Sequence, residues 1–158
     1  MLAISHYKGI YLAPEGANIL EIMRIAELFP RFVELEEAEE HSKEVSLGEL
    51  EATINGFQKD KSLGSDGWTI EFYIAFFDIL GQDLLKVVEN YRISGRMSLA
   101  IKSMFIALIP KSDKPSSFND FRPIYLCNCL YKIMAKIIAN RLKPILSAHI
   151  SPEQFDFL

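Results

Sequence analysis

The sequence predicts an α+β fold that is mostly helical, with one small antiparallel β-hairpin. Apolar residues recur at the helical period in four stretches, which are residues 18–29, 46–57, 69–91 and 130–146. Two short runs of β-branched and aromatic residues are typical of strands, and they cover residues 105–109 and 124–126. The segment between them has the Pro, Ser, Asn and Asp content of a loop. We therefore expect a hairpin between a helical N-terminal half and a C-terminal helix.

The first helix is expected over residues 18–29 and should end at Pro30, because proline cannot continue an α-helix. Helical spacing predicts an apolar side facing a core, formed by Ile19, Ile22, Met23 and Ala26, with Leu20 as a further candidate. The acidic run that follows, residues 34–44, is expected to be a solvated linker or helix rather than a functional acidic patch.

A second helix is predicted over residues 46–57. Ser46 would be its N-cap, and Glu49 at the third helical position would complete a capping box. Its apolar stripe consists of Leu47, Leu50, Ile54 and Phe57. Residues 64–67 then break the pattern and indicate a turn.

The stretch 69–91 is densely apolar, and Gly81 in its middle predicts two abutting helices or one kinked helix. The apolar positions are Ile70, Phe72, Tyr73, Phe76, Phe77, Leu80, Leu84, Leu85 and Val88. Aromatic residues at this spacing could stack on bases. Because the positions follow the helical period, packing in a core is the favoured interpretation.

The last helix is predicted over residues 130–146, with Pro144 ending or bending its last turn. Its buried side would consist of Ile133, Met134, Ile137, Ile138, Leu142 and Leu146. A mostly basic ridge occupies another face, formed by Lys132, Lys136, Asn140 and Lys143. The ridge is either an ordinary solvated face or a surface that contacts a nucleic-acid backbone.

Two cations flank the predicted hairpin loop. Lys111 follows the first strand and Arg122 begins the second, so pairing the strands would bring both to the same end. Two converging cations can hold a phosphate chain, Arg through its planar fork and Lys as a point charge.

Composition and length fit one domain with a hydrophobic core, since 49% of the 158 residues are hydrophobic. Cys127 and Cys129 are expected to be buried free thiols in a reducing compartment, and the three histidines are too dispersed to indicate a zinc site. No signal peptide or membrane-spanning run is evident. We expect an intracellular protein, with nucleus and cytoplasm left open.

The net charge of −4 conceals an asymmetry. Residues 1–58 carry four basic and eleven acidic side chains, whereas residues 101–150 carry eight basic and two acidic ones. The overall acidity is atypical of a free-standing nucleic-acid binder. The local charge of +6 is where a nucleic acid would be attracted.

The order of several blocks resembles the reverse transcriptase of non-long-terminal-repeat (LINE-type) retrotransposons, most closely those of plants. The blocks are KDKSLGSDGW (59–68), similar to KxKSPGPDG, then IEFYIAFFDILGQDLL (70–85), FIALIPK (105–111), DFRPIYL (120–126), YKIMAKIIANRL (131–142) and SPEQFDFL (151–158), similar to SxxQxGF. The likeness covers roughly residues 45–158. The sequence departs from the family pattern at Leu63, Ser65, Tyr125 and Asp156, which indicates a decaying or fragmentary element.

The resemblance implies a joining region over residues 1–45 and a partial reverse transcriptase domain, the fingers, over residues 46–158. The metal-binding aspartates of the family palm, in FxxDxxxAFD and YxDD patterns, have no counterpart here. Since this polymerisation needs carboxylates around two divalent ions, we expect no catalytic residue, no metal ligand and no cofactor in this chain. Magnesium would be expected only in a complete polymerase.

By the same resemblance, Lys111 and Arg122 match residues that approach the triphosphate of the incoming nucleotide in complete family members; the alternative is that both are surface cations beside strand ends. Lys59 and Lys61 are expected either to meet template phosphates or simply to be exposed to solvent. Lys132, Lys136 and Lys143 belong to the ridge described above and would be its contacts with a nucleic-acid backbone if it is not an ordinary solvated face. Asp66 and Gly67 match a structural turn, with Asp bonding its own backbone and Gly supplying positive φ.

The expected partners are an RNA template and a DNA primer, and the oligomeric state stays open. Two alternatives remain beside the inactive polymerase part. One is a non-catalytic helical module that binds RNA or a partner protein. The other is a non-functional retroelement remnant with exposed apolar surface.

Overall fold

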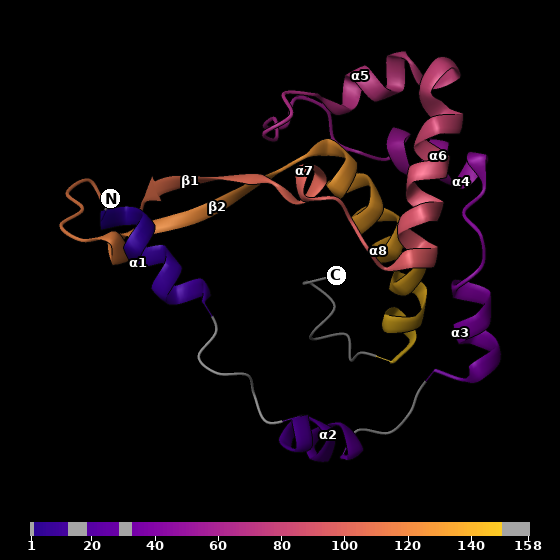
Figure 1. Cartoon of the computed structure of the whole chain (residues 1–158), viewed down its shortest axis with the longest axis horizontal. Helices are drawn as coiled ribbons and strands as arrows, with labels where there is room; N and C mark the ends of the chain where they lie inside the picture. The colour runs from indigo at the N-terminus through magenta and orange to yellow at the C-terminus, as the bar shows by residue number, and fades with distance from the viewer. Residues whose placement is uncertain (1, 13–18, 29–32, 150–158) are drawn as a thin grey trace. The chain divides into compact units, whose positions relative to one another are not determined.

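The computed structural model describes residues 2–12, 19–28 and 33–149. Among the described residues, helices α1 to α7 precede one pair of strands and helix α8 follows it, which confirms the predicted α+β class (Figure 1). In chain order the elements are α1 (Leu2–Tyr11), α2 (Ile19–Glu27), α3 (Leu35–His41), α4 (Leu47–Asn55), α5 (Ile70–Ala75), α6 (Phe77–Ser94), α7 (Leu99–Lys102), β1 (Met104–Pro110), the 3-10 turn η1 (Phe118–Asp120), β2 (Phe121–Cys127) and α8 (Cys129–His149).

The chain divides into two compact units. One, the hairpin-tip unit, consists of Met1–Glu34 and Leu108–Pro123. The other, the helical unit, consists of Leu35–Ala107 and Ile124–Leu158. The predicted division at residue 45 rests on the family resemblance and stays a prediction.

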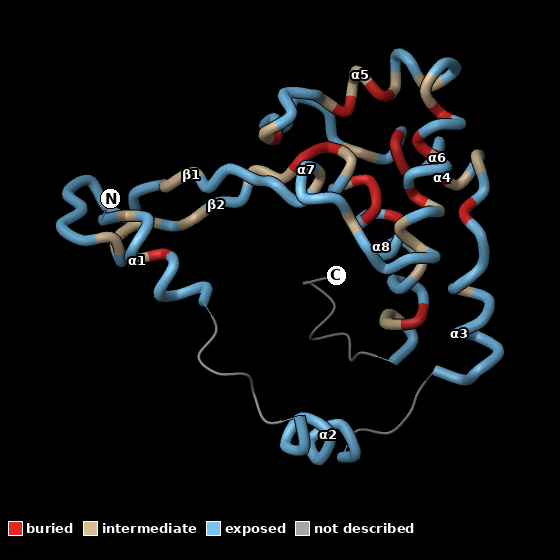
Figure 2. Tube along the Cα trace, in the orientation of Figure 1, coloured by how far each residue is buried: buried red, intermediate tan, exposed pale blue. Residues whose placement is uncertain are grey.

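The core of the helical unit lies between α4, α5, α6 and α8, where the buried residues gather (Figure 2). Leu50 and Ile54 of α4 and Ile133 of α8 are almost completely enclosed. Leu50 and Ile54 are four residues apart, so both lie on one side of α4, as the apolar stripe predicted. Burying these side chains supplies most of the driving force for packing α4 against α8.

The start of α4 confirms half of the predicted capping box. The Ser46 hydroxyl accepts a hydrogen bond from the Glu49 amide at 3.1 Å. The Glu49 carboxylate, however, pairs with Arg141 of α8, with both of its oxygens 2.6 Å from guanidinium nitrogens. A full charge partner outcompetes a single backbone amide, so the reciprocal half of the box was predicted wrongly.

The apolar stretch after Thr69 forms two helices, but they meet at Phe76 and not at Gly81. Gly81 is buried inside α6. A Cβ at Gly81 would lie 3.1 Å from the Phe77 ring and 3.4 Å from the Leu47 side chain. The glycine therefore allows close packing of α6 and does not break it.

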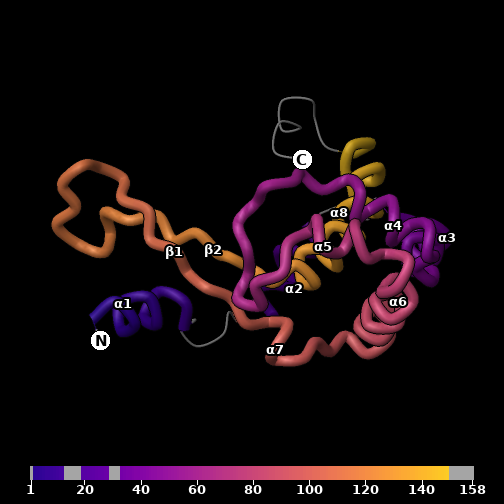
Figure 3. Tube along the Cα trace, turned by 90° about the horizontal axis from the view of Figure 1, so that it is seen from above, coloured from indigo at the N-terminus to yellow at the C-terminus, as the bar shows by residue number. Residues whose placement is uncertain are grey.

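The two strands pair into the predicted hairpin, closed by a loop that contains η1 (Figure 3). At the end of β1, the Lys111 amide donates to the Asp120 carbonyl at 2.7 Å. Within the hairpin-tip unit, the Tyr7 hydroxyl of α1 donates to the Phe118 carbonyl at 3.2 Å. Side chains along both strands are exposed or half-buried.

Helix α8 is longer than expected, since it contains Pro144 and extends to His149. Ile133, Met134 and Ile137 are buried as predicted. Ile138 and Leu142 are 45% and 43% exposed, contrary to prediction. They lie at the rim of an open cavity of about 280 Å³ that α6 also lines, so this side of α8 is incompletely covered.

The predicted helices before Ser46 form, but their packing differs from expectation. Helix α2 buries none of its residues, so Ile19, Ile22 and Met23 do not face a core among the described residues. Its apolar periodicity predicted the helix correctly and its burial wrongly. The predicted end at Pro30 lies outside the described residues. The acidic segment forms the exposed helix α3, which is one of the two predicted alternatives, a helix or a solvated linker.

No helix in the described ranges is long and apolar enough to cross a bilayer.

Candidate nucleic-acid interface

The backbone of the hairpin tip fixes the position of Lys111. Its ammonium group donates to the Asn119 carbonyl at 2.7 Å, and its amide donates to the Asp120 carbonyl at the same distance. One of the three ammonium donors is thus used inside the loop, and two remain for an external anion. The side chain is exposed.

A single carboxylate holds the loop that Lys111 leads into. Asp120 Oδ2 accepts hydrogen bonds from the Ser116 and Ser117 amides, both at 2.9 Å, and from their hydroxyls at 3.1 and 3.2 Å. These donors, the Ser116 amide first, hold the pKa of Asp120 below its usual value. The negative charge of Asp120 is therefore directed toward the loop's own donors.

Arg122 is exposed, and no described residue pairs with it. Lys111 directly follows β1 and Arg122 is the second residue of β2, and the hydrogen bond from the Lys111 amide to the Asp120 carbonyl closes the hairpin beside both of them. Both cations lie at one end of the hairpin, as predicted, and their binding to a nucleotide stays a prediction.

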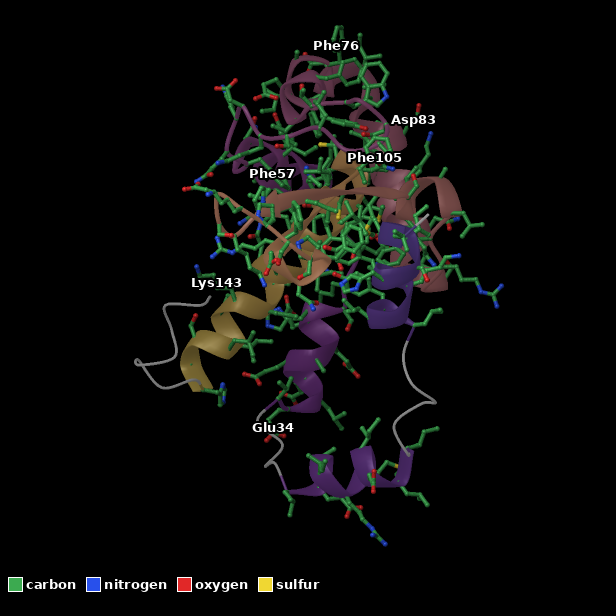
Figure 4. All side chains as sticks on the ribbon, turned by 90° about the vertical axis from the view of Figure 1, so that its left-hand side faces the viewer. Glu34, Phe57, Phe76, Asp83, Phe105 and Lys143 are labelled. Atoms are coloured by element: carbon green, nitrogen blue, oxygen red, sulfur yellow. The ribbon has the colours of Figure 1, made fainter. Side chains whose placement is uncertain are left out.

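The predicted basic ridge lies on the helical unit, and its members have different roles there. The Lys132 ammonium donates to the Ser62 carbonyl at 3.0 Å, and the Asn140 amide reaches the Thr53 hydroxyl at 3.4 Å. These two side chains attach α8 to the preceding loop and to α4. Lys136 and Lys143 are exposed, and Lys143 projects from α8 (Figure 4).

Lys59 and Lys61 flank a tight bend in the loop between α4 and α5, and both are exposed. Asp60 between them has a φ of 59°, and its amide donates to the Glu71 carboxylate at 2.7 Å. That hydrogen bond holds the pKa of Glu71 below its usual value. Lys59 and Lys61 are therefore exposed on either side of a bend that the hydrogen bond between Asp60 and Glu71 holds in place.

The turn predicted at Asp66 and Gly67 is present. Gly67 has a φ of 74°, in the region that favours glycine, and its amide donates to the Gly64 carbonyl at 3.2 Å. Asp66 Oδ1 accepts from the Trp68 amide at 3.4 Å, so Asp66 does bond its own backbone.

Sequence reasoning missed Asn128, which holds this turn in place. The residue is 4% exposed. Its Oδ1 accepts from the Ser65 hydroxyl at 2.7 Å and from the Asp66 amide at 3.1 Å. Its Nδ2 donates to the carbonyls of Ala100 and Ile101 at 2.8 and 3.4 Å. The only sequence signal was a single amide between an apolar strand and an apolar helix.

Sequence reasoning also missed Arg141, which was counted only as part of the positive charge of residues 101–150. Besides Glu49, its guanidinium donates to the carbonyls of His41, Lys43 and Glu44 at 2.7–3.2 Å. These contacts use the whole donor fork. Arg141 therefore closes the segment before α4 onto α8 and offers no free donor to a phosphate.

The two cysteines are free thiols, as predicted, but Cys127 is only half-buried, contrary to the predicted burial of both. Cys129 is buried, and burial raises the pKa of its thiol to about 11.

Within the described residues, no group of three or more His, Cys, Asp or Glu side chains is arranged to hold a metal ion. Glu153 and Asp156 lie outside the described residues.

Comparison with known proteins shows that the sequence is similar to a transposon protein. No protein-family model matches it. It is 36% identical over 110 residues to the Transposon TX1 uncharacterized 149 kDa protein of Xenopus laevis. The aligned part covers 70% of this chain and 8% of that protein, so the chain spans a small part of the relative it matches. The sequence is similar to a transposon-encoded protein, which supports a transposon origin.

Proposed function

We propose that this chain is the fingers part of an RNA-directed DNA polymerase of a LINE-type retrotransposon, and that it binds RNA without transferring nucleotides. The hairpin tip carries the proposal, because its hydrogen-bonded loop holds Lys111 and Arg122 at one end with unused donors. The similarity to a transposon protein supports it. The likeness to plant elements remains a feature of the sequence blocks.

The proposed binding uses two sets of cations, one on each compact unit. At the hairpin tip, the guanidinium fork of Arg122 can engage two oxygens of one phosphate, and Lys111 adds a point charge. On the helical unit, Lys59, Lys61 and Lys136 present exposed ammonium groups to the backbone of a single strand. Such contacts release counterions and make affinity depend on salt.

A complete polymerase of this type would use magnesium ions held by carboxylates. The described residues offer no such carboxylate group, so we assign them binding alone. In a primer-extension assay with Mg²⁺ and an RNA template, we expect no incorporation by this chain. Template-dependent incorporation above background would contradict that expectation.

Fluorescence anisotropy with a labelled single-stranded RNA, measured over a series of KCl concentrations, tests the binding. The logarithm of the affinity should fall linearly with the logarithm of salt concentration, with a slope of roughly −0.7 for each phosphate contact. Replacing Lys111→Glu together with Arg122→Glu should weaken binding. It should also make the slope less negative by about 0.7 to 1.4, which corresponds to the loss of one or two phosphate contacts.

The matched control is Lys86→Glu with Arg96→Glu, which makes the same change in charge at exposed positions outside both cation sets. We expect this control to retain the salt slope of the parent chain. If both double variants lose RNA affinity equally, the loss comes from the change in net charge and not from the hairpin tip. Salt-insensitive or absent binding would remove the proposal.

The exposed apolar residues favour a second candidate, a helical module that binds a protein. Helix α2 exposes Ile19, Leu20, Ile22, Met23 and Ile25. If the chain binds no RNA but self-associates or binds an apolar dye, this second candidate or a non-functional remnant would replace the first.

A further inference from the structure

Three aromatic rings form a row at the start of α5. The ring centroids of Trp68 and Phe72 are 4.2 Å apart, and those of Phe72 and Phe76 are 5.0 Å apart. Trp68 is 48% exposed and Phe76 is 46% exposed, whereas Phe72 between them is half-buried. The row therefore ends in two rings that reach solvent, with Phe76 at the corner between α5 and α6 (Figure 4).

This arrangement corrects the expectation that the aromatic residues of this stretch all belong to the core. Ile70 and Tyr73 are each 7% exposed and do face the core. Phe76 does not, because the chain changes direction there between α5 and α6. Large aromatic rings left in water are costly, which raises the question of what covers them.

The charge beside Trp68 indicates the chemistry of the missing contact. A small cavity of about 30 Å³ lies at its ring, and the two charged residues that line it, Lys61 and Lys132, are both cations. Lys61 has no hydrogen-bond or ion-pair partner among the described residues. The Lys132 ammonium donates one hydrogen bond to the Ser62 carbonyl, which leaves two of its donors unused there. The nearby carboxylates of Asp66 and Glu71 instead accept from backbone amides.

The backbone holds Trp68 in a fixed place. On one side, the turn at Gly67 is closed by a hydrogen bond to Gly64. On the other, the Thr69 hydroxyl caps α5 by accepting from the Phe72 amide at 3.2 Å. A ring held in this way loses little conformational entropy when a ligand stacks on it.

We propose that Trp68 is a stacking platform for an unpaired base of single-stranded RNA, with Lys61 and Lys132 binding the phosphates beside that base. The combination of an exposed ring and flanking cations is how proteins bind single strands without reading their sequence. This inference rests on the proposed RNA-binding function and adds to it a site, a ligand class and a contact to the base.

The chain contains a single tryptophan, so its fluorescence reports on this site alone. We would titrate the parent chain with an eight-nucleotide RNA and with an abasic ribose–phosphate strand of equal length. RNA should quench the Trp68 emission and bind roughly 5- to 150-fold more tightly than the abasic strand, given the usual contribution of one stacked base. The abasic strand should bind weakly and leave the emission unchanged.

Two substitutions refine the test, with folding checked by circular dichroism. Trp68→Leu should lower RNA affinity by the same factor and leave the affinity for the abasic strand unchanged, while Trp68→Phe should retain most of the RNA affinity. Phe105→Leu, at another exposed aromatic residue, serves as the control and should bind like the parent chain.

The outcomes separate this inference from the function on which it rests. If RNA and the abasic strand bind equally and neither quenches Trp68, the stacking site is wrong and backbone binding stands. If neither strand binds even at low salt, both the site and the proposed function fail. The comparison of the two strands uses only the parent chain, so it decides the matter even if a variant does not fold.

Discussion

The Asn128 side chain accepts a hydrogen bond from the Ser65 hydroxyl at 2.7 Å, across 63 residues of sequence. The same amide donates to the Ala100 carbonyl in α7. Asn128 thus joins the turn before α5, helix α7 and the start of α8 at one buried point. Because that turn leads into Trp68, the proposed stacking site depends on a residue that lies far from it in sequence.

Replacing Asn128→Ala should lower the free energy of unfolding by about 2–3 kcal/mol. The substitution removes four hydrogen bonds of a buried side chain, each with a net contribution of about 0.5–1.5 kcal/mol, and water replaces part of this at the exposed residues Asp66 and Ala100. Urea unfolding followed by circular dichroism measures the change.

The control for this prediction is Asn90→Ala, which truncates an exposed asparagine of α6. Its effect should stay within about 0.5 kcal/mol, as is usual for surface positions. Equal effects of the two substitutions would show that the Asn128 contacts contribute nothing specific.

Gly64→Ala should destabilise the protein by about 1–3 kcal/mol or prevent folding. A Cβ at Gly64 would lie 2.5 Å from both the Asn128 Cα and the Cys127 carbonyl oxygen, and neither backbone atom can move easily. The matched substitution is Gly48→Ala in α4, where a Cβ meets nothing within 4 Å. It should stabilise α4 by up to about 1 kcal/mol, so opposite signs in the two unfolding curves are the expected result.

Local signals in the sequence were enough for several elements, although the short helices α1 and α7 were not predicted. The strand-like runs on either side of a polar loop predicted the hairpin, and the spacing of Leu50 and Ile54 predicted both α4 and its buried side. The glycine after Asp66 predicted a turn with positive φ. In each case the cause and its effect lie within a few residues.

Contacts between distant residues could not be predicted in this way. Glu49 had an ideal local role at the start of α4, yet its carboxylate pairs with Arg141, 92 residues later. The periodicity of α2 could not reveal whether another element covers it, and Ile138 had the spacing of a core residue without the burial. Charge counting failed for the same reason, because it could not show which cations are already paired.

The pair formed by Arg141 and Glu49 should contribute more to stability than a surface ion pair. Their side chains are only 16% and 31% exposed, and Arg141 also holds three carbonyl oxygens. Arg141→Met should cost about 2–3 kcal/mol in the free energy of unfolding, since charged hydrogen bonds are lost in a half-buried place. Arg141→Lys should recover part of this, as lysine keeps the charge but not the fork.

Lys86→Met is the matched control for the Arg141 substitution, because Lys86 pairs with Asp83 at 2.8 Å while both side chains are 76% exposed. Its effect should be below about 1 kcal/mol. If Arg141→Met costs no more than Lys86→Met, the described network does not hold the segment before α4.

Glu89 makes the stability of the helical unit sensitive to acid. Its carboxylate accepts from the Arg92 guanidinium at 2.7–2.9 Å and from the Val45 amide at 2.8 Å. These contacts, that of Arg92 first, hold the pKa of Glu89 below its usual value. The stability they contribute is therefore present above the unfolded pKa of about 4.3 and is lost as the pH falls through the lower, folded pKa.

Glu89→Gln should consequently be less stable than the parent chain by about 1 kcal/mol at pH 7, since it loses the charge that both donors address. The difference should shrink as the pH is lowered below about 4.3, because the parent chain then becomes protonated at the same position. Urea unfolding at a series of pH values measures both curves. Glu51→Gln removes the same charge from an exposed position on α4 and should show no such difference at pH 7. A gap between parent and Glu89→Gln that stays constant into acid would mean that the lost stability comes from side-chain shape and not from the ionised carboxylate.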